Sequence, residues 1–220
     1  MPEPPRTTSR PPDILGAVLV HRWDAPIDDD EWRTFAVAQG FGHLIAAGHN
    51  RDVPVVVPTQ FILDSDSILL HLARPNPIWA AIDENPLVLL SIAGDWSYIP
   101  SAWKAIGDED PMMGIPTTYY GAAQLTARAE IIDEPAEVAT VLRAQLSSLQ
   151  PDVEVTDPLA HGTKLGQIRG LRLDIIEVRA KFKYGGNVDG DHRAAIAERL
   201  ETRDGPGDQA ARAHVMRRSD

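Results

Sequence analysis

The sequence of 220 residues contains no cysteine. This absence excludes disulfide scaffolds, cysteine nucleophiles, thiolate-ligated haem, iron–sulfur clusters and cysteine-based zinc sites. Lysine is also scarce, since the sequence holds only Lys104, Lys164, Lys181 and Lys183. The formal net charge of -11 makes the surface repel phosphate backbones, so we expect no binding to nucleic acid.

Long apolar runs are absent as well. No stretch approaches the roughly 20 residues that span a bilayer, so we expect no membrane partner. Residues 1–13 are rich in Pro, Ser and Thr and have no apolar segment of signal-peptide type, which predicts a disordered tail and a cytoplasmic protein. Hydrophobic residues still make up 43% of the sequence, enough for one sizeable core.

Short segments rich in Val, Ile and Leu, separated by turn residues, predict β-strands. These strands are expected over 41–47, 54–63, 67–73, 87–94, 119–132 and 167–178. Apolar residues at helical spacing predict helices over 28–39, 78–83, 134–149 and 191–201, with one more near the end. The elements indicate an α+β fold in which an antiparallel β-barrel with peripheral helices occupies 14–205, followed by a helical tail over 206–220.

Several catalytic motifs are missing. The sequence has no Walker phosphate loop, no Gly-x-Gly-x-x-Gly after a strand, no His-Glu-x-x-His and no Gly-x-Ser-x-Gly. A serine hydrolase therefore has no support. The seven histidines are scattered, and none forms a pair at metal-ligand spacing on a helix, so a site with several histidine ligands is a weak hypothesis.

His71 is the histidine that stands out. It lies inside a predicted strand, directly before the segment Arg74-Pro75-Asn76-Pro77. One interpretation is a core or solvent-facing histidine with ordinary hydrogen bonds. The other is a ligand, because a neutral imidazole held on a rigid strand suits the iron of haem. His43 is the second candidate for that role.

Two further segments carry side chains that suit a cofactor. The segment 95–116 is expected to be irregular, and its aromatic residues Tyr98 and Trp103 would form flat walls with polar handles. After the last strand, Lys181 and Lys183 could hold a phosphate or a haem propionate against the acidic background. A basic strand end followed by a turn is the plainer interpretation.

Together these segments resemble the PaiB-type family of FMN-binding negative transcriptional regulators, from Phe41 to about Leu200. The resemblance implies the flavin split-barrel fold, shared with pyridoxamine-phosphate oxidases, and a homodimer with its cofactor at the interface. The matching residues are Phe41-Gly42, Pro58, His71-Leu72-Ala73 with Asn76-Pro77-Ile78-Trp79, Tyr98-Ile99-Pro100-Ser101 with Trp103, Pro116-Thr117, and Lys183 with Asn187.

Three segments depart from the family's usual pattern. Val55-Val56-Val57-Pro58 stands in place of Thr-His-Leu-Pro, so a polar flavin contact is lost. Residues 115–120 replace Val-Pro-Thr-Trp-Asn-Tyr, and residues 183–187 replace Lys-Leu-Ser-Gln-Asn. Because all three fall on expected cofactor contacts while the framework persists, we expect the pocket to hold something other than FMN.

The segment Lys181-Phe182-Lys183-Tyr184-Gly185-Gly186-Asn187 is similar to a branch of this family, the haem-dependent piperazate synthases. That resemblance implies haem b as cofactor and N5-hydroxy-L-ornithine as substrate, which is closed into L-piperazic acid by forming a nitrogen–nitrogen bond. The alternatives are an FMN-dependent oxidoreductase, a PaiB-like transcriptional regulator and other haem chemistry.

The resemblance also implies roles for individual residues. His71 would be the axial ligand of the iron, and Arg74 and Lys183 would bind propionates or the substrate carboxylate. Asn76 and Trp103 belong to the implied cofactor contacts. The implied catalytic residues are Lys183 and the possible proton donors Tyr98, Tyr119 and Tyr120.

Overall fold

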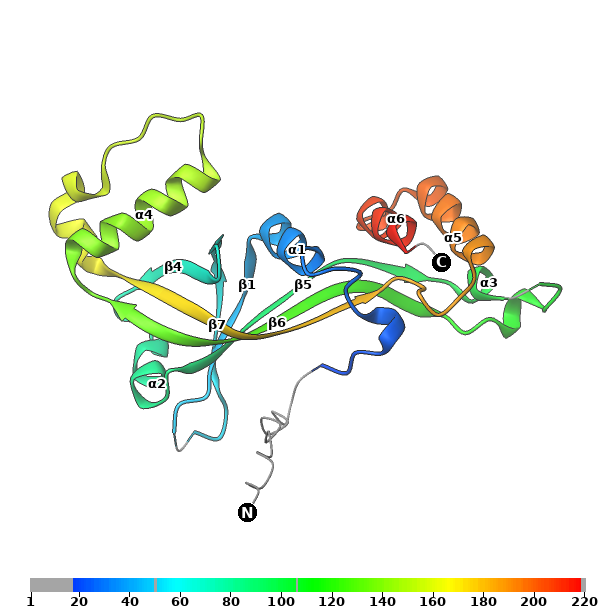
Figure 1. The fold of residues 1–220 in the computed structure, drawn as a ribbon, viewed down its shortest axis with the longest axis horizontal. Coiled ribbons are helices and arrows are strands. Elements are labelled where there is room, and N and C mark those ends of the chain that lie inside the picture. Colours follow the sequence, from blue (N-terminus) through cyan, green and yellow to red (C-terminus); the bar gives the residue numbers. More distant parts are fainter. Residues whose placement is uncertain (1–17, 50, 106, 219–220) are drawn as a thin grey trace, which may run out of the picture.

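The computed structural model describes residues 18–49, 51–105 and 107–218. Seven strands form one antiparallel sheet in the order β2-β1-β5-β6-β7-β4-β3 (Figure 1). The strands are β1 (Phe41–Ala46), β2 (Val55–Gln60), β3 (Ile62–Asp64), β4 (Ser67–Ala73), β5 (Leu87–Ile99), β6 (Thr117–Ile132) and β7 (Ile168–Lys183). The predicted α+β class and antiparallel barrel are confirmed.

The two edge strands of the sheet, β2 and β3, are consecutive in the chain. The single strand expected over 54–63 is therefore wrong, because it divides at Phe61, whose backbone N–H donates to Gly40 O at 3.1 Å. Phe61 points into the main core, whereas the next residue, Ile62, packs into a second cluster with α4 residues. Joining the two edges through one residue curls the sheet into a barrel.

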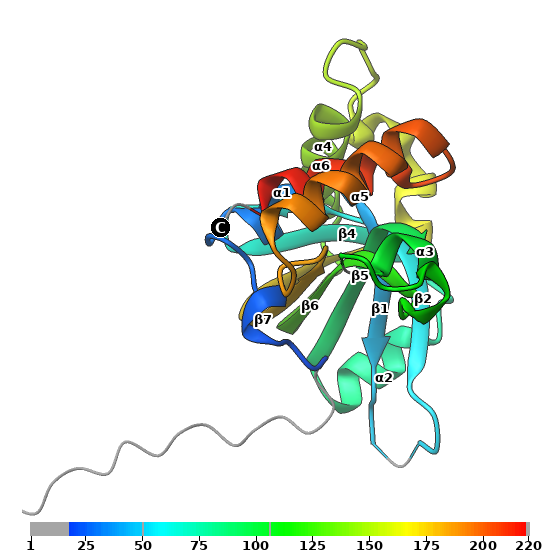
Figure 2. The ribbon, with the colours of Figure 1, turned by 90° about the vertical axis from the view of Figure 1, so that its right-hand side faces the viewer.

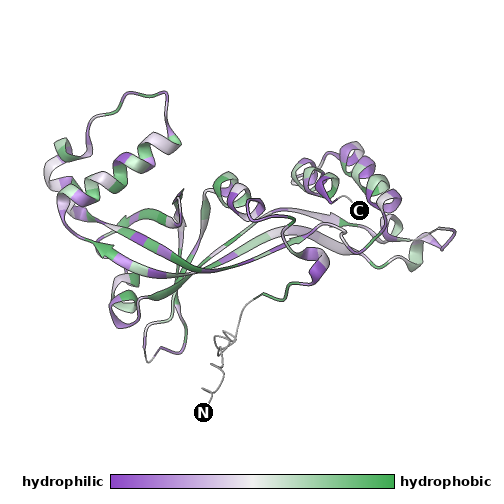
Figure 3. Cartoon of the chain, viewed as in Figure 1, coloured by the Kyte–Doolittle hydropathy of each residue, from purple (hydrophilic) through white to green (hydrophobic). Residues whose placement is uncertain are grey.

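The helices lie around this sheet. They are α1 (Glu31–Gln39), α2 (Ile78–Glu84), α3 (Ser101–Lys104), α4 (Pro135–Leu149), α5 (Gly190–Arg203) and α6 (Asp208–Arg217), with short 3-10 turns η1 (Arg22–Asp24), η2 (Pro111–Met113) and η3 (Pro158–Gln167). Figure 2 shows α2 on the opposite side of the barrel from α1, α5 and α6. Hydrophilic and hydrophobic residues alternate along α4 in Figure 3, and its apolar side packs on the sheet.

Strands β5, β6 and β7 extend beyond the barrel and form an elongated arm with α3, α5 and α6 (Figure 1). The expected strand ends at 94 and 178 are wrong, because β5 continues to Ile99 and β7 to Lys183. A β-bulge between Gly94 and Ser97 interrupts the local pattern, and Asp95 has a φ of 51° there. Gln39 and His214 bind the Asp95 carboxylate at 2.9 Å each, so tertiary contacts hold the bulge.

The last helix of the arm is fixed to the sheet by a buried carboxylate. Asp208 accepts hydrogen bonds from Ser97 Oγ at 2.7 Å and from the Arg203 guanidinium at 2.6 and 2.7 Å. The predicted tail over 1–13 lies outside the described residues. No helix in the described ranges combines the length and apolar character needed to cross a membrane.

Candidate cofactor and substrate sites

The first group of predicted site residues lies at the barrel end, which we define as β4, α2, α4 and the start of β7. Alternation along β4 places His71 on the same face as Leu69, which packs with α4 residues, and opposite the core residues Leu70 and Leu72. His71 Nδ1 lies 2.6 Å from Oε1 of Gln145, a residue of α4 that is only 4% exposed. The imidazole itself is exposed.

This contact sets the protonation of the neutral ring. An amide oxygen only accepts hydrogen bonds. In the neutral ring, His71 Nδ1 therefore carries the proton, and its N–H donates a hydrogen bond to Gln145 Oε1. The lone pair of Nε2 is then available to a metal. A metal-bound histidine is commonly oriented in this way by an acceptor on its other nitrogen. The macrocycle of haem supplies four nitrogens, so one such histidine fits an iron porphyrin.

The other two predicted residues of the barrel end are bound within the chain. The Arg74 guanidinium donates to Gly166 O at 2.7 Å and lies 2.8 Å from the Asp133 carboxylate. Asn76 Oδ1 accepts the backbone N–H of Ile78 at 3.1 Å, as expected of a residue that caps the start of α2. These contacts tie β4 and α2 to their neighbours.

The second group lies in the arm. A cavity of about 480 Å³, here called the arm pocket, is lined by the polar residues Lys104, Glu109, Thr117, Tyr119, Lys183 and Asn187 together with glycine and apolar residues. It brings Tyr119 and Lys183 together, as the predicted catalytic role of both requires. Lys183 Nζ donates to Thr117 Oγ1 at 2.6 Å.

Tyr119 is 2% exposed, and its hydroxyl has no hydrogen-bond partner among the described residues. Burial raises the pKa of Tyr119 to about 12, so the hydroxyl stays protonated at neutral pH. The backbone of Gly185 makes room for it: Gly185 has a φ of +80°, and a Cβ there would lie 2.5 Å from the Tyr119 oxygen.

The remaining predicted residues lie apart from the arm pocket. Tyr98 pairs with Thr118 in the sheet, whereas Tyr119 pairs with Ser97, so the two tyrosines project from opposite faces of the sheet. Tyr98 is 51% exposed. Trp103 is partly buried, and the Arg203 guanidinium carbon lies 4.6 Å from the centre of its ring.

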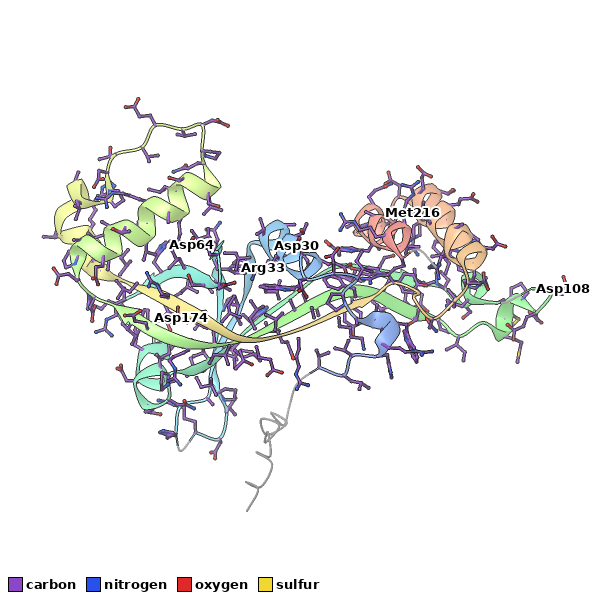
Figure 4. The ribbon with its side chains drawn as sticks, viewed as in Figure 1. Asp30, Arg33, Asp64, Asp108, Asp174 and Met216 are labelled. Carbon is purple, nitrogen blue, oxygen red and sulfur yellow. The ribbon has the colours of Figure 1, made fainter. Side chains whose placement is uncertain are left out.

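Within one chain the two groups are far apart. His71 pairs with Gly170 at one end of β7, and Lys183 lies at the other end of that strand, thirteen residues later (170 to 183). At about 3.3 Å per residue the separation is roughly 40 Å. In Figure 4, Asp108 lies at the tip of the arm and Asp64 lies beside the barrel.

Two residues of these sites were not predicted. Gln145 follows Val138 and Val141 on the apolar face of α4, and a polar residue at such a core position is the signal that could have revealed it. Lys104 is one of only four lysines and follows Trp103. Among the residues that the structure describes, no group of three or more His, Asp or Glu side chains forms a metal site.

Comparison with solved structures identifies the class of fold. The flavocytochrome Anf3 from Azotobacter vinelandii is 22% identical with a TM-score of 0.58, covering 80% of this chain and 78% of its own. The FAD and heme binding protein from Mycobacterium smegmatis is 15% identical with a TM-score of 0.58, covering 79% of this chain and 78% of its own. At these identities the likeness shows the fold, an antiparallel split barrel.

A comparison with protein families is more specific. Residues 24–177 match the family described as "Putative FMN-binding domain". The match spans well over half of the sequence, and the chain belongs to this family. None of the curated proteins matches the sequence.

Proposed function

We propose that the protein is a haem-dependent piperazate synthase, which closes N5-hydroxy-L-ornithine into L-piperazic acid. The α-nitrogen forms a bond to N5 as the N5–O bond breaks. The proton lost by the α-nitrogen and the departing hydroxide leave as water, so the reaction needs no external oxidant or reductant. Three observations support the proposal: the match to the FMN-binding family, the resemblance to piperazate synthases around Lys183, and the contact of His71 with Gln145.

The observation that carries the haem assignment is the contact between His71 and Gln145. In the neutral ring this contact leaves the lone pair of Nε2 free and orients the ring on a rigid strand, so His71 would be able to hold an iron ion. Haem, when bound there, would supply Lewis-acid polarisation of the N–O bond. Arg74 already binds Asp133 and Gly166, and Asn76 caps α2, so their part in cofactor binding would be to shape the site.

The residues of the arm pocket have the properties that the remaining steps need. Tyr119 is protonated and has no hydrogen-bond partner in the part of the chain that the structure describes, so it can donate a hydrogen bond to the departing oxygen. Lys183 would hold the substrate beside it. Folding a flexible amino acid so that its two nitrogens meet is an orientation effect, which can lower a barrier by several kcal/mol.

A second copy of the chain is part of this proposal. The roughly 40 Å between His71 and Lys183 prevents one chain from placing both groups on one small substrate. A homodimer with two-fold symmetry would bring the barrel end of one protomer to the arm of its partner. Light scattering after size-exclusion chromatography should give twice the mass of the chain, and a monomer would contradict this arrangement.

The experiment that tests the function is haem loading followed by assay with N5-hydroxy-L-ornithine. Wild-type protein should show a Soret band and release L-piperazic acid. His71→Ala should lose or shift the Soret band and abolish cyclisation while circular dichroism stays unchanged. His43→Ala, at an exposed position of β1, is the control and should keep both. Haem uptake by His71→Ala equal to that of the wild type would refute the ligand assignment.

A second candidate is an FMN-dependent oxidoreductase, which the family description favours. The same spectra separate the two. A yellow protein with flavin absorbance and no Soret band after haem loading would replace the first proposal by the second.

A further inference from the structure

The arm pocket is lined by two ammonium groups and one carboxylate, that of Glu109, so basic side chains outnumber acidic ones there, unlike in the protein as a whole. Two of the four lysines of a chain with net charge -11, Lys104 and Lys183, line one cavity. They come from α3 and from the end of β7, so only the folded arm brings them together. Sequence analysis predicts no role for Lys104.

The pocket also contains a hydrogen-bond donor without an acceptor. Burying a hydroxyl without a partner is costly, and native proteins nearly always avoid it. Tyr119 Oη is such a group among the described residues; Tyr119 is one of the residues that line the pocket, and its hydroxyl lies against the backbone of Gly185. Because its pKa of about 12 keeps it protonated, the hydroxyl has a proton to donate to an acceptor.

The surroundings of Lys104 indicate the charge of that acceptor. Burial, and secondly the nearby Lys183 ammonium, lower the pKa of Lys104. Burial and the charge of Lys104 also lower the pKa of His192, whose Nε2 has no partner within the described residues. An anion between the two lysines would relieve this repulsion.

We propose that the arm pocket binds an oxyanion, a carboxylate or a phosphate, held by the ammonium groups of Lys104 and Lys183 and by the hydroxyl of Tyr119. The inference deepens the proposed function and rests on it for the identity of the ligand, because the substrate of that reaction carries an α-carboxylate. A propionate of haem or the phosphate of FMN would bring the same chemistry.

Three matched pairs of probes identify the source of the oxyanion. L-ornithine and putrescine differ by the carboxylate, haem and its dimethyl ester by the propionates, and FMN and riboflavin by the phosphate. Titration calorimetry with the haem-free, full-length protein measures the first and third pairs, and the Soret band measures the second. In one pair, the member that carries the oxyanion, here called the anionic probe, should bind at least about tenfold more tightly than the member that lacks it.

Variants then locate that preference. Lys104→Gln and Tyr119→Phe should each weaken the preferred anionic probe by about tenfold or more, because each removes one hydrogen bond to a charged group. Lys164→Gln removes the same charge as Lys104→Gln from an exposed position in η3 and should leave binding unchanged. In the wild type, the same probe should raise the pKa of Lys104, followed by NMR of its side chain.

The outcomes separate this inference from the proposed function. If no anionic probe is preferred, or if Lys104→Gln behaves like Lys164→Gln, the oxyanion site is refuted whatever the spectrum of the haem-loaded protein. If the anion binds through Lys104 but His71→Ala retains haem and activity, the site stands and the iron-ligand assignment falls. A response confined to FMN supports the site and assigns its oxyanion to a flavin phosphate.

Discussion

The barrel end and the arm pocket treat their polar side chains in opposite ways. At the barrel end, His71, Arg74 and Asn76 each bind a partner from the same chain. In the arm pocket, the buried hydroxyl of Tyr119 has no partner among the described residues, and Lys104 lies near a second ammonium group. The barrel end is therefore preorganised by folding, whereas the arm pocket keeps a buried hydroxyl without a partner among the described residues and two neighbouring ammonium groups.

Some polar groups of this protein therefore contribute to the stability of the fold, whereas others are left for a ligand. Contacts at the barrel end orient one imidazole nitrogen outward and stabilise the fold at the same time. In the arm pocket, Tyr119 lies against the close backbone of Gly185, which does not satisfy its hydroxyl. Such a site is stabilised when a ligand binds and costs stability when it is empty.

The largest expected effect comes from detaching the arm helices. Asp208→Asn removes the charge that accepts from Arg203 and Ser97, and it should lower the free energy of unfolding by about 2 to 3 kcal/mol at pH 7, measured by denaturant titration. Asn76→Ala at the barrel end is the comparison. An equal loss in the two variants would contradict the importance of the buried carboxylate.

The stability contributed by the ion pair of Asp208 and Arg203 depends on pH. The Arg203 guanidinium lowers the pKa of Asp208 to about 2 from an ordinary value of 3.8. A carboxylate with a lowered pKa stabilises the fold above its unfolded pKa and loses that contribution as pH falls through the folded pKa. Wild-type stability should therefore fall between about pH 4 and pH 2. Asp208→Asn should lack this part of the decrease.

The next effect concerns the orientation of His71. Gln145→Leu removes the acceptor of its Nδ1 proton and should weaken haem binding about ten- to hundredfold in a Soret titration. Gln145→Glu retains an acceptor, so it should restore most of the affinity and lower the reduction potential of the iron. Equal affinities in the Leu and Glu variants would show that position 145 acts only through packing.

A smaller effect compares two buried tyrosines that contact each other edge to face, Tyr119 and Tyr184. The Tyr184 hydroxyl donates to Asp95 O at 3.0 Å, so Tyr184→Phe should lower the free energy of unfolding by about 1 to 2 kcal/mol. Tyr119→Phe removes a hydroxyl without a partner and should leave stability unchanged or raise it. Thermal unfolding of the ligand-free protein measures both, and a comparable loss in Tyr119→Phe would mean that its hydroxyl is already satisfied.

The smallest effect is expected at the start of α2. Asn76→Ala removes the acceptor of the Ile78 N–H and should lower the free energy of unfolding by about 1 kcal/mol. Haem binding should fall little, because the side chain acts on the helix. A complete loss of haem with an intact fold would instead place Asn76 in direct contact with the cofactor.

Local patterns in the sequence predicted most of the fold. Short segments rich in Val, Ile and Leu marked β1 and β4, Gly40 ended α1 with a φ of 55°, and the apolar stripe of α4 was evident. The bulge at Asp95 and the division at Phe61 were missed. Both depend on partners distant in the chain, namely His214 for Asp95 and Gly40 for Phe61.

The candidate sites show the same division. The amino-acid sequence limits which side chains are available to a site, since it lacks cysteine and has family-like residues around His71 and Lys183. Which of these side chains lie close together depends on the tertiary structure. Folding brings His71 to Gln145 and places Lys104 and Lys183 in one cavity, and it directs Tyr98 and Tyr119 to opposite faces of the sheet. Periodicity and propensity act over a few residues, whereas hydrogen-bond partners, burial and electrostatic repulsion are set by segments that meet after the sheet has curled.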